Sequence, residues 1–502
     1  MALSLKRRLR DNLHGSIDLT ILEDKVIGHP YFQRLRRIKQ TALLHLVFPG
    51  ATHTRFEHSL GVMHQAGLAF QKIKTNQNLL KYKYDSHPAQ AHFETVQHEQ
   101  LEEVLGLSFP LMSTIFESEY IQQALRLAAL LHDVGHPPFS HSGERFLPKI
   151  SQIIKANPLD TYLKDYLLNL STQNDRSNHE IFTLLMVDHM LKEIYAQNKD
   201  IDCVVAPQDV LAILKPEIAP CPDSPLITLQ AQQLCHDLVS GEIDVDRMDY
   251  LLRDSRECGV VYGIFDVERI MDSLCLYYNT REKKLHLALL QSGLAAFEDY
   301  LRARQSMYLQ LYFHKTSIGC EAMLKNIIKK LGSWTLPAEI KAYVQEDEYS
   351  LYHTLMQAKE EHIKDPETKQ TFERHLRNLF YDRKLWKRVY EIQAYNLEDH
   401  NQIEKAKKVL AKFNLPFEHV SSINILTRAL SKNLYSEKQT SLRLIQKDAQ
   451  QLLRVVPLRQ GVSPRFEANT VKIDRLYMDS DGLGEDTILR IKKAFYEDLL
   501  HS

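Results

Sequence analysis

The chain has 502 residues, which leaves room for several domains or for one large core with an added lobe. Hydrophobic residues make up 44% and charged residues 25%, a balance that excludes wholesale disorder and fibrous repeats. The 63 basic and 64 acidic side chains nearly cancel, so the whole molecule does not attract a polyanion as dedicated duplex-DNA-binding proteins do. With only 17 glycines and 18 prolines, helices are favoured over a sandwich or barrel.

The six cysteines include no Cys-x-x-Cys pair and are too sparse for a disulfide scaffold, which favours a reducing compartment. The segment Met1–Arg10 is basic, but no apolar run with a cleavage site follows it. No run of about 18 uncharged apolar residues occurs anywhere in the chain. We therefore expect a cytoplasmic protein that does not enter a membrane.

The first predicted helix spans residues 30–39. Phe32, Leu35 and Ile38 recur every three residues on one side, as in an amphipathic helix, and Pro30 suits its first position.

A second helix is predicted to begin near Thr54, because Thr54 and Glu57 have the spacing of a capping box just before an apolar run. His58 would then lie in its first turns. The stretch 74–120 is polar, and we interpret it as an inserted excursion outside the core.

The segment 121–131 is apolar on nearly every side, which is typical of a helix buried deep in a protein. It leads into the string HDVGHPPFSHSGE. Since Pro137 and Pro138 cannot continue a helix, the chain must turn there, and chemistry often occupies such a turn.

Two further helical stretches begin at Asn178 and Gly241. Beyond about residue 330 the sequence is rich in Lys, Glu and Gln with helical periodicity, whereas 441–480 holds short strand-like runs. The expected fold is mainly α. It comprises a helical core at 1–330 with insertions at about 74–120 and 146–177, a helical extension at 331–440 and a small α+β lobe at 441–502.

His132 and Asp133 stand at the end of the buried helix, where an ionised carboxylate is costly unless a cation compensates it. An isolated His-Asp pair is common by chance, and a lone buried histidine is more often a packing residue than a ligand. His58 and Asp246, however, lie on predicted helices of their own and would complete a set of nitrogen and oxygen ligands with room for water. That set is typical of one catalytic divalent cation, with Mn, Fe, Zn, Mg and Ni not distinguished.

Three strings occur in order: HTRFEHSLG, LLHDVGHPPFSH and DVDRMDYLLRDS. Over roughly residues 8–325 the chain resembles the HD-domain metal-dependent phosphohydrolases. Within them it resembles the deoxynucleotide triphosphohydrolases, which include bacterial members and the mammalian SAM-and-HD-domain enzyme. The resemblance implies an all-α HD bundle with His58, His132, Asp133 and Asp246 as metal ligands. It also implies hydrolysis of dNTPs, by water attack at the α-phosphate, to a deoxynucleoside and inorganic triphosphate.

A cation lowers the pKa of bound water, so a neighbouring base can prepare that water for attack on phosphorus. His141 and Glu144 stand three residues apart, a helical spacing that lets the carboxylate orient the ring. The resemblance makes these two the catalytic pair, with His136 and His179 as further histidines facing the phosphates. A purely structural role for His136 and His179 is the alternative.

A triphosphate needs fixed cations besides the metal, and an additional Mg ion could accompany it. Arg55 stands three residues before His58 and Arg247 directly follows Asp246, which places both near the predicted metal. Arg304 matches another phosphate-facing arginine by resemblance. Sugar selection needs polar groups that reach the 3′-hydroxyl and a bulky wall that excludes a 2′-hydroxyl. By resemblance these substrate-binding residues are Gln40, Tyr250, Asp254 and Tyr312.

Family members are often homo-oligomers, dimers or tetramers, with allosteric nucleotide sites. Gly28 stands where the mammalian relative reads an activating guanine with an acidic residue, so that activator is not expected here even if Arg7 meets a phosphate. Two alternatives stay open: an HD phosphohydrolase acting on nucleoside monophosphates or signalling nucleotides, and a nucleotide-sensing or nucleic-acid-binding regulator. In the second, the basic runs LKRRLR and KNIIKK would contact single-stranded nucleic acid.

Overall fold

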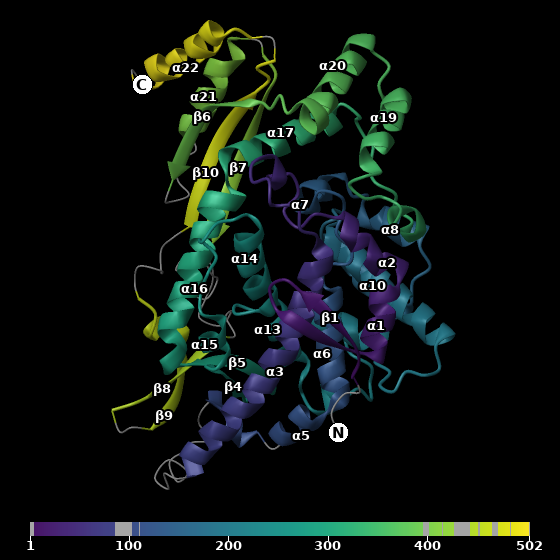
Figure 1. Ribbon diagram of the computed structural model, residues 1–502, viewed down its shortest axis with the longest axis vertical. Coiled ribbons are helices and arrows are strands. Elements are labelled where there is room, and N and C mark those ends of the chain that lie inside the picture. Colours follow the sequence, from purple (N-terminus) through teal and green to yellow (C-terminus); the bar gives the residue numbers. More distant parts are fainter. Residues whose placement is uncertain are drawn as a thin grey trace.

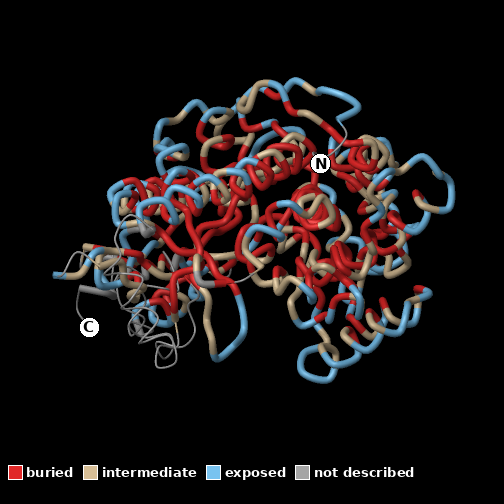
Figure 2. Tube along the Cα trace, turned by 90° about the horizontal axis from the view of Figure 1, so that it is seen from below, coloured by how far each residue is buried: buried red, intermediate tan, exposed pale blue. Residues whose placement is uncertain are grey.

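Helices form most of this molecule, which is shown as a computed structural model in Figure 1. They surround a continuous buried interior, which appears red in Figure 2. The mainly α fold class is thereby confirmed. The structure describes residues 5–85, 103–109, 111–394, 401–413, 415–425, 442–449, 452–463, 470–481 and 483–500.

The N-terminal part of the chain begins with a β-hairpin and continues as helices. The hairpin strands are β1 (Leu5–Asp11) and β2 (Gly15–Thr20). The helices that follow are α1 (Ile21–Gly28), α2 (Pro30–Gln33), α3 (Arg55–Asp85), α5 (Met112–Glu117), α6 (Glu119–Leu131), α7 (Ser140–Gly143), α8 (Ile150–Ala156), α9 (Thr161–Gln173), α10 (His179–Gln197), α11 (Pro207–Leu214), α12 (Pro225–Thr228), α13 (Gln232–Ser240) and α14 (Val245–Glu257).

The rest of the described chain mixes helices and strands. Its helices are α15 (Val267–Met271), α16 (Leu294–Met307), α17 (Lys315–Lys329), α18 (Ile340–Tyr343), α19 (Leu351–His362), α20 (Pro366–Arg377), α21 (Asn401–Ala411) and α22 (Glu485–Leu500). Its strands are β4 (Leu274–Asn279), β5 (Lys284–Leu290), β6 (Lys387–Ala394), β7 (Phe417–Ile425), β8 (Arg443–Lys447), β9 (Leu453–Pro457) and β10 (Thr470–Met478); the short β3 (Glu103–Leu105) precedes them in the chain.

The helical core is built on α3, which lies along α6 and α14. The predicted burial of α6 is confirmed, since its residues from Ala124 to Leu131 are all buried. Packing on every side removes a large apolar area from water, which is the main favourable term in folding. It also fixes the end of α6, from which the His132–Asp133 turn emerges.

Two sheets lie beside this core. One has the order β3-β4-β5-β8-β9, in which β8 runs parallel to β5 and the other neighbours are antiparallel. The other is antiparallel with the order β6-β10-β7, and α21 and α22 share a small apolar core with it. The sheets therefore join segments that are far apart in sequence.

Several details differ from the expectations. The helix predicted at 30–39 ends at Gln33 and continues as a 3-10 turn, because Arg34 is buried and donates to backbone carbonyls of distant segments. The excursion predicted at 74–120 does not begin at residue 74, because helix α3 continues to Asp85. Within this part of α3, Asn76 is buried and donates to the carbonyls of Met271 and Leu274. Residues 86–102 lie outside the described part.

The expected domain boundaries stay predictions, but strands cross them. Strands β6 and β7 fall within 331–440, which was expected to be helical, and they pair with β10 of the expected lobe. The strand-like runs at 453–457 and 470–478 are confirmed as β9 and β10, although they belong to different sheets. Long-range strand pairing leaves no local signal in a sequence, which explains the difference.

Candidate metal and catalytic site

The ends of two helices bring the first site residues together. Helix α3 begins at Arg55, with the hydroxyl of Thr54 bonded to the carboxylate of Glu57, so His58 lies one turn inside a buried helix. Helix α6 ends at Leu131, and the chain turns through His132. Gly135 makes this turn feasible, because a Cβ there would collide with the backbone where α10 begins.

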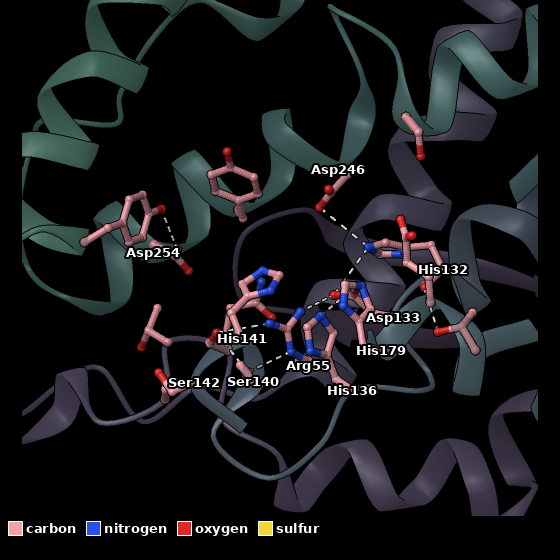
Figure 3. Close-up of a pocket in the computed structure, with 18 of the residues that line it drawn as sticks. Arg55, His132, Asp133, His136, Ser140, His141, Ser142, His179, Asp246 and Asp254 are labelled. Atoms are coloured by element: carbon pink, nitrogen blue, oxygen red, sulfur yellow. Dashed lines mark hydrogen bonds and ion pairs between the residues drawn. The ribbon is translucent and has the colours of Figure 1, made fainter. Parts of the chain in front are cut away.

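The four predicted metal ligands converge. Oδ1 of Asp246 lies 3.0 Å from Nε2 of His58 and 3.5 Å from Nε2 of His132, as the dashed line to His132 shows in Figure 3. Oδ2 of Asp133 lies 3.6 Å and 3.4 Å from the same two nitrogens. Two carboxylates this close to the same two ring nitrogens can share one divalent cation with them.

The two histidines present unused nitrogens to this space. Nδ1 of His58 contacts Oδ2 of Asp249 at 2.8 Å, and Nδ1 of His132 contacts the carbonyl of Ala129, also at 2.8 Å. Neither Nε2 atom has a hydrogen-bond partner in the described chain, although both are buried. Buried polar atoms are nearly always satisfied, so an orphaned pair facing two carboxylates fits a bound cation.

The charges of the site agree with this fit. Burial opposes ionisation of Asp133, but Arg55 and His132 hold the pKa of its carboxyl well below the usual range. Asp246 is buried too, yet the neighbouring rings of His132 and His58 lower the pKa of its carboxyl. Burial also opposes charge on His58, but the flanking Asp246 and Asp249 raise its pKa to about 10. The space between the carboxylates thus favours a positive charge.

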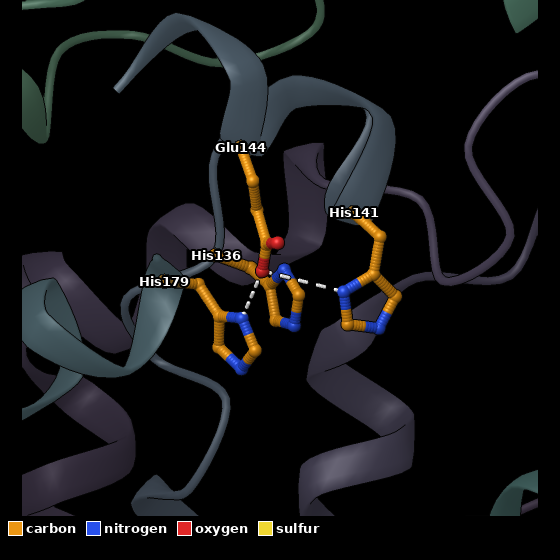
Figure 4. A group of neighbouring side chains, drawn as sticks. All are labelled: His136, His141, Glu144 and His179. Carbon is orange, nitrogen blue, oxygen red and sulfur yellow. Dashed lines mark hydrogen bonds and ion pairs between the residues drawn. The ribbon is translucent and has the colours of Figure 1, made fainter. Parts of the chain in front are cut away.

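A second group of side chains adjoins the ligands (Figure 4). Oε1 of Glu144 accepts from Nδ1 of His179 and lies 3.3 Å from Nδ1 of His141. The rings of His136 and His179 stack with centroids 3.7 Å apart, and Nε2 of His136 lies 3.4 Å from Oδ1 of Asp133. The predicted catalytic histidines and Glu144 are therefore brought together.

Ionisation within this group differs from residue to residue. Burial and the charge of Arg55 lower the pKa of His136 well below its usual value, so the ring is neutral. Burial opposes the charge of Glu144, but hydrogen bonds from His141 and His179 lower its pKa. The side chain of His141 is 72% exposed, which leaves it accessible to a molecule in the pocket.

Within each of two groups of side chains, the possible ligand atoms all lie within 4.8 Å of one another. The first group is His58, His132 and Asp133, and the second is His136, His141, Glu144 and His179. In the second group, Glu144 is already engaged by two rings. The first group is the better cation site because its unpartnered nitrogens face two carboxylates.

Most of these residues line a pocket of about 410 Å³, although His58 and Glu144 are not among its lining residues. In Figure 3, Asp254 lies on the left of the labelled side chains and His132 on the right, so the two mark opposite ends of the view. Asp254 is buried and held from two sides, by Nε2 of His53 and the hydroxyl of Tyr312, each at 2.6 Å. Of the predicted residues, Gln40, Arg55, His132, Asp133, His136, His141, His179, Asp246, Tyr250, Asp254 and Tyr312 line the pocket.

The arginines do not all lie where the sequence predicts. Arg55 does line the pocket, donating to Oγ of Ser140 at 2.9 Å and to Asp133. Arg247 pairs instead with Asp244 at 2.7 Å, because that residue caps the same helix. Neither Arg247 nor Arg304 is among the lining residues.

Sequence reasoning missed several site residues. Lys215 lines the pocket and pairs with Glu180 at 2.7 Å. Glu321 lines it too, and burial raises the pKa of its carboxyl. Asp249, three residues after Asp246, carries the clearest missed signal, since that spacing puts both carboxylates on one helix face.

The predicted departure at Gly28 falls at the exposed end of α1. The guanidinium of Arg7 is engaged with Asp24 at 3.1 Å.

A family model described as HD domain matches residues 111–253. The chain contains an HD domain. A second model, described as HD associated region, matches residues 265–452 of this HD-domain protein. The matches lie around the site and continue through much of the C-terminal part.

Relatives of this HD-domain protein extend the comparison. The uncharacterised protein MJ1154 of Methanocaldococcus jannaschii is 30% identical over 68% of this chain and 53% of its own length. The uncharacterised YwfO of Bacillus subtilis is 30% identical over 65% of this chain and 56% of its own. Human deoxynucleoside triphosphate triphosphohydrolase SAMHD1 is 26% identical over 64% of this chain and 44% of its own. The predicted family resemblance is confirmed, and the chain spans about half the length of the curated relatives it matches.

A solved structure supports the fold. A hypothetical protein from Aquifex aeolicus, 23% identical, superposes with a TM-score of 0.62 over 98% of this chain and 100% of its own. Among the described residues, no helix is both long and apolar enough to cross a membrane.

Proposed function

We propose that the protein is a divalent-metal-dependent phosphohydrolase that converts dNTPs to deoxynucleosides and inorganic triphosphate. The observation that carries this proposal is the convergence of His58, His132, Asp133 and Asp246 beside a histidine cluster, at a pocket that three of the four line. The name of a distant relative, human SAMHD1, supports the choice of substrate.

The four converging side chains would hold the metal. When bound, a divalent cation supplies Lewis acidity toward water and toward a phosphate oxygen. The charges at this end of the pocket suit an anionic substrate, because Arg55 and Lys215 both line it. Cations fixed in a partly dry site stabilise phosphate charge more strongly than solvated ones do.

The histidine cluster provides proton transfer. The attacking water forms a bond to the α-phosphorus, the bond to the 5′ oxygen breaks, and that oxygen needs a proton. Glu144 orients the ring of His141, which takes the proton of the water. His179, whose Nδ1 contacts the same carboxylate, is placed to protonate the leaving oxygen.

The far end of the pocket suits a deoxyribose. The carboxylate of Asp254, fixed by His53 and Tyr312, can accept from a 3′-hydroxyl, and Gln40 has a buried Oε1 without a partner in the described chain. Tyr250 and Tyr312 meet edge to face with centroids 6.1 Å apart, which supplies a rigid wall.

One observation favours a second candidate. Because Arg247 and Arg304 do not line the pocket, fewer fixed cations meet a triphosphate than the resemblance implies. A phosphohydrolase acting on nucleoside monophosphates or signalling nucleotides would need fewer fixed cations in its pocket.

The products decide between the two. Purified protein is incubated with Mn²⁺ and each dNTP, and the products are separated by anion exchange. We expect tripolyphosphate and deoxynucleoside in equal amounts. Orthophosphate or nucleoside monophosphate alone would show that the reaction type is wrong.

A further inference from the structure

A chain of buried charged groups connects the turn of the N-terminal hairpin with a proposed metal ligand. Oδ2 of Asp249 lies 2.8 Å from Nδ1 of His58, and Oδ1 lies 2.6 Å from Nε2 of His14. Arg253 donates from Nε to Oδ2 of Asp249 at 2.8 Å and from Nη1 to Oδ1 of Asp11 at 2.9 Å. The contacts thus run from β1 through α14 to α3.

The four residues that link to His58 in this way do not line the pocket, so they do not touch a substrate bound there. They are Asp249, Arg253, Asp11 and His14. Asp249 and Arg253 are fully buried, and Asp11 is nearly so. Buried ion pairs are weak stabilisers compared with apolar residues of similar volume, because each charge must be taken out of water. A role other than stability is therefore needed to explain the buried charges of Asp249, Arg253 and Asp11, which reach His58 through Asp249.

The packing around this network is tight. Gly61 lies one turn after His58 on α3, and a Cβ there would collide with Oδ1 of Asp249 and the guanidinium of Arg253. The carboxylate cannot yield easily, since each of its oxygens accepts from two donors. The absence of a side chain on α3 is what lets Asp249 reach His58.

We infer that Asp249, Arg253, Asp11 and His14 form a positioning network that orients the His58 ring and keeps its proton on Nδ1. Nε2 then presents a lone pair to the cation. The inference rests on the proposed metal site.

It also makes the hairpin turn a determinant of metal affinity. His132 differs from His58 in this respect, because a backbone carbonyl orients it.

The main test replaces Asp249 by Asn. All four hydrogen bonds to this carboxylate come from donors, so the amide NH₂ of Asn must face a donor in either orientation. We expect Asp249→Asn to weaken Mn²⁺ binding by about 10–100-fold, the usual effect of losing a partner that orients a ligand. Binding is measured by the loss of the free Mn²⁺ signal in electron paramagnetic resonance. At saturating Mn²⁺ the KM for dNTP should stay near its wild-type value.

Two milder variants guard against misfolding. His14→Ala removes one donor near the surface, and Gly61→Ala displaces the carboxylate while leaving every network residue in place. Both should weaken Mn²⁺ binding several-fold. Glu23→Gln is the matched control, because Glu23 is a fully buried carboxylate that pairs with Arg126 at 2.7 Å and bonds Gln123 and Thr20 instead of the network residues. It should lower the melting temperature without changing Mn²⁺ affinity.

Wild-type Mn²⁺ affinity in folded Asp249→Asn and His14→Ala would overturn the inference. An equal loss in Glu23→Gln would overturn it too, because general loosening would then explain the effect. Failure of the proposed function looks different: wild-type protein would bind Mn²⁺, the variants would bind it less tightly, and none would release tripolyphosphate.

Discussion

Asp133 links the two halves of the site at the scale of single residues. Its Oδ2 faces His58 and His132, whereas its Oδ1 lies 3.4 Å from Nε2 of His136 in the histidine cluster. Arg55 pairs with the same carboxylate and lowers its pKa, so the charge is kept at neutral pH. One carboxylate thus faces both the proposed cation site and the proposed catalytic rings.

Replacing Asp133 by Asn should lower activity and metal binding without unfolding the protein. We expect turnover of dNTP to fall by roughly 10²–10³-fold, the scale of losing one group that acts directly on the reaction. Mn²⁺ affinity should fall with it, because the ligand set loses a negative charge. Asp188→Asn is a matched control, since Asp188 is a nearly buried carboxylate on α10 that bonds Tyr162 and Lys192. Near-normal turnover in Asp133→Asn would count against the assigned role.

The sequence could predict which candidate ligands lie together, but not the residues that support them. His58, His132 and Asp133 stand in distinctive strings at helix ends, which is why the structure brings together residues predicted to meet. Arg247 shows where adjacency misleads, because a neighbour in sequence can turn toward its own helix cap. Lys215 was not predicted as a pocket residue, because no local sequence pattern distinguishes it from a lysine on the surface.

At the scale of elements, contacts from α18 and from the turn after α2 hold the turn that follows α6. The hydroxyl of Tyr343 in α18 donates to the carbonyl of Gly135 at 2.8 Å, and its ring stacks on Phe182. Arg34 donates to the carbonyl of His136 at 2.8 Å and to that of Glu346 at 2.9 Å. The turn after α6 is therefore fixed from two sides, although helical periodicity predicts neither contact.

An acidic residue connects α20 with the end of β10, and its ionisation makes this connection pH-dependent. Burial opposes ionisation of Asp479, but hydrogen bonds from His375 and Arg374 lower its pKa to about 2. In an unfolded chain the carboxyl titrates near 3.9. Its stabilising effect is therefore complete above about pH 4 and disappears as the pH falls toward 2.

Replacing Asp479 by Asn should lower the free energy of unfolding at pH 7 by about 1–2 kcal/mol and flatten its decline between pH 4 and 2. Urea unfolding measured across this pH range tests the expectation. Asp272→Asn serves as comparison, because its ion pair with Lys72 is largely exposed and should contribute little. If the free energy of unfolding of Asp479→Asn declined between pH 4 and 2 as steeply as that of the wild type, the bonds of Asp479 would not contribute to stability.

At the scale of the whole molecule, the helical core is not independent of the chain that follows it. Strand β8 adds to the sheet of β4 and β5 in parallel, and β10 completes the sheet of β6 and β7. Helical periodicity predicted the mainly α class and several core helices, because it is a local property. Parallel pairing between strands about 150 residues apart is not local, so it was not predicted. Assembly into a homo-oligomer and control by nucleotides stay proposals.

The central claim is that four distant side chains surround one divalent cation. Crystals grown with Mn²⁺ and measured near the manganese absorption edge test this claim most directly. We predict one strong anomalous peak among Nε2 of His58, Nε2 of His132 and the carboxylates of Asp133 and Asp246. A peak only among His136, His141, Glu144 and His179, or none at either place, would contradict the account.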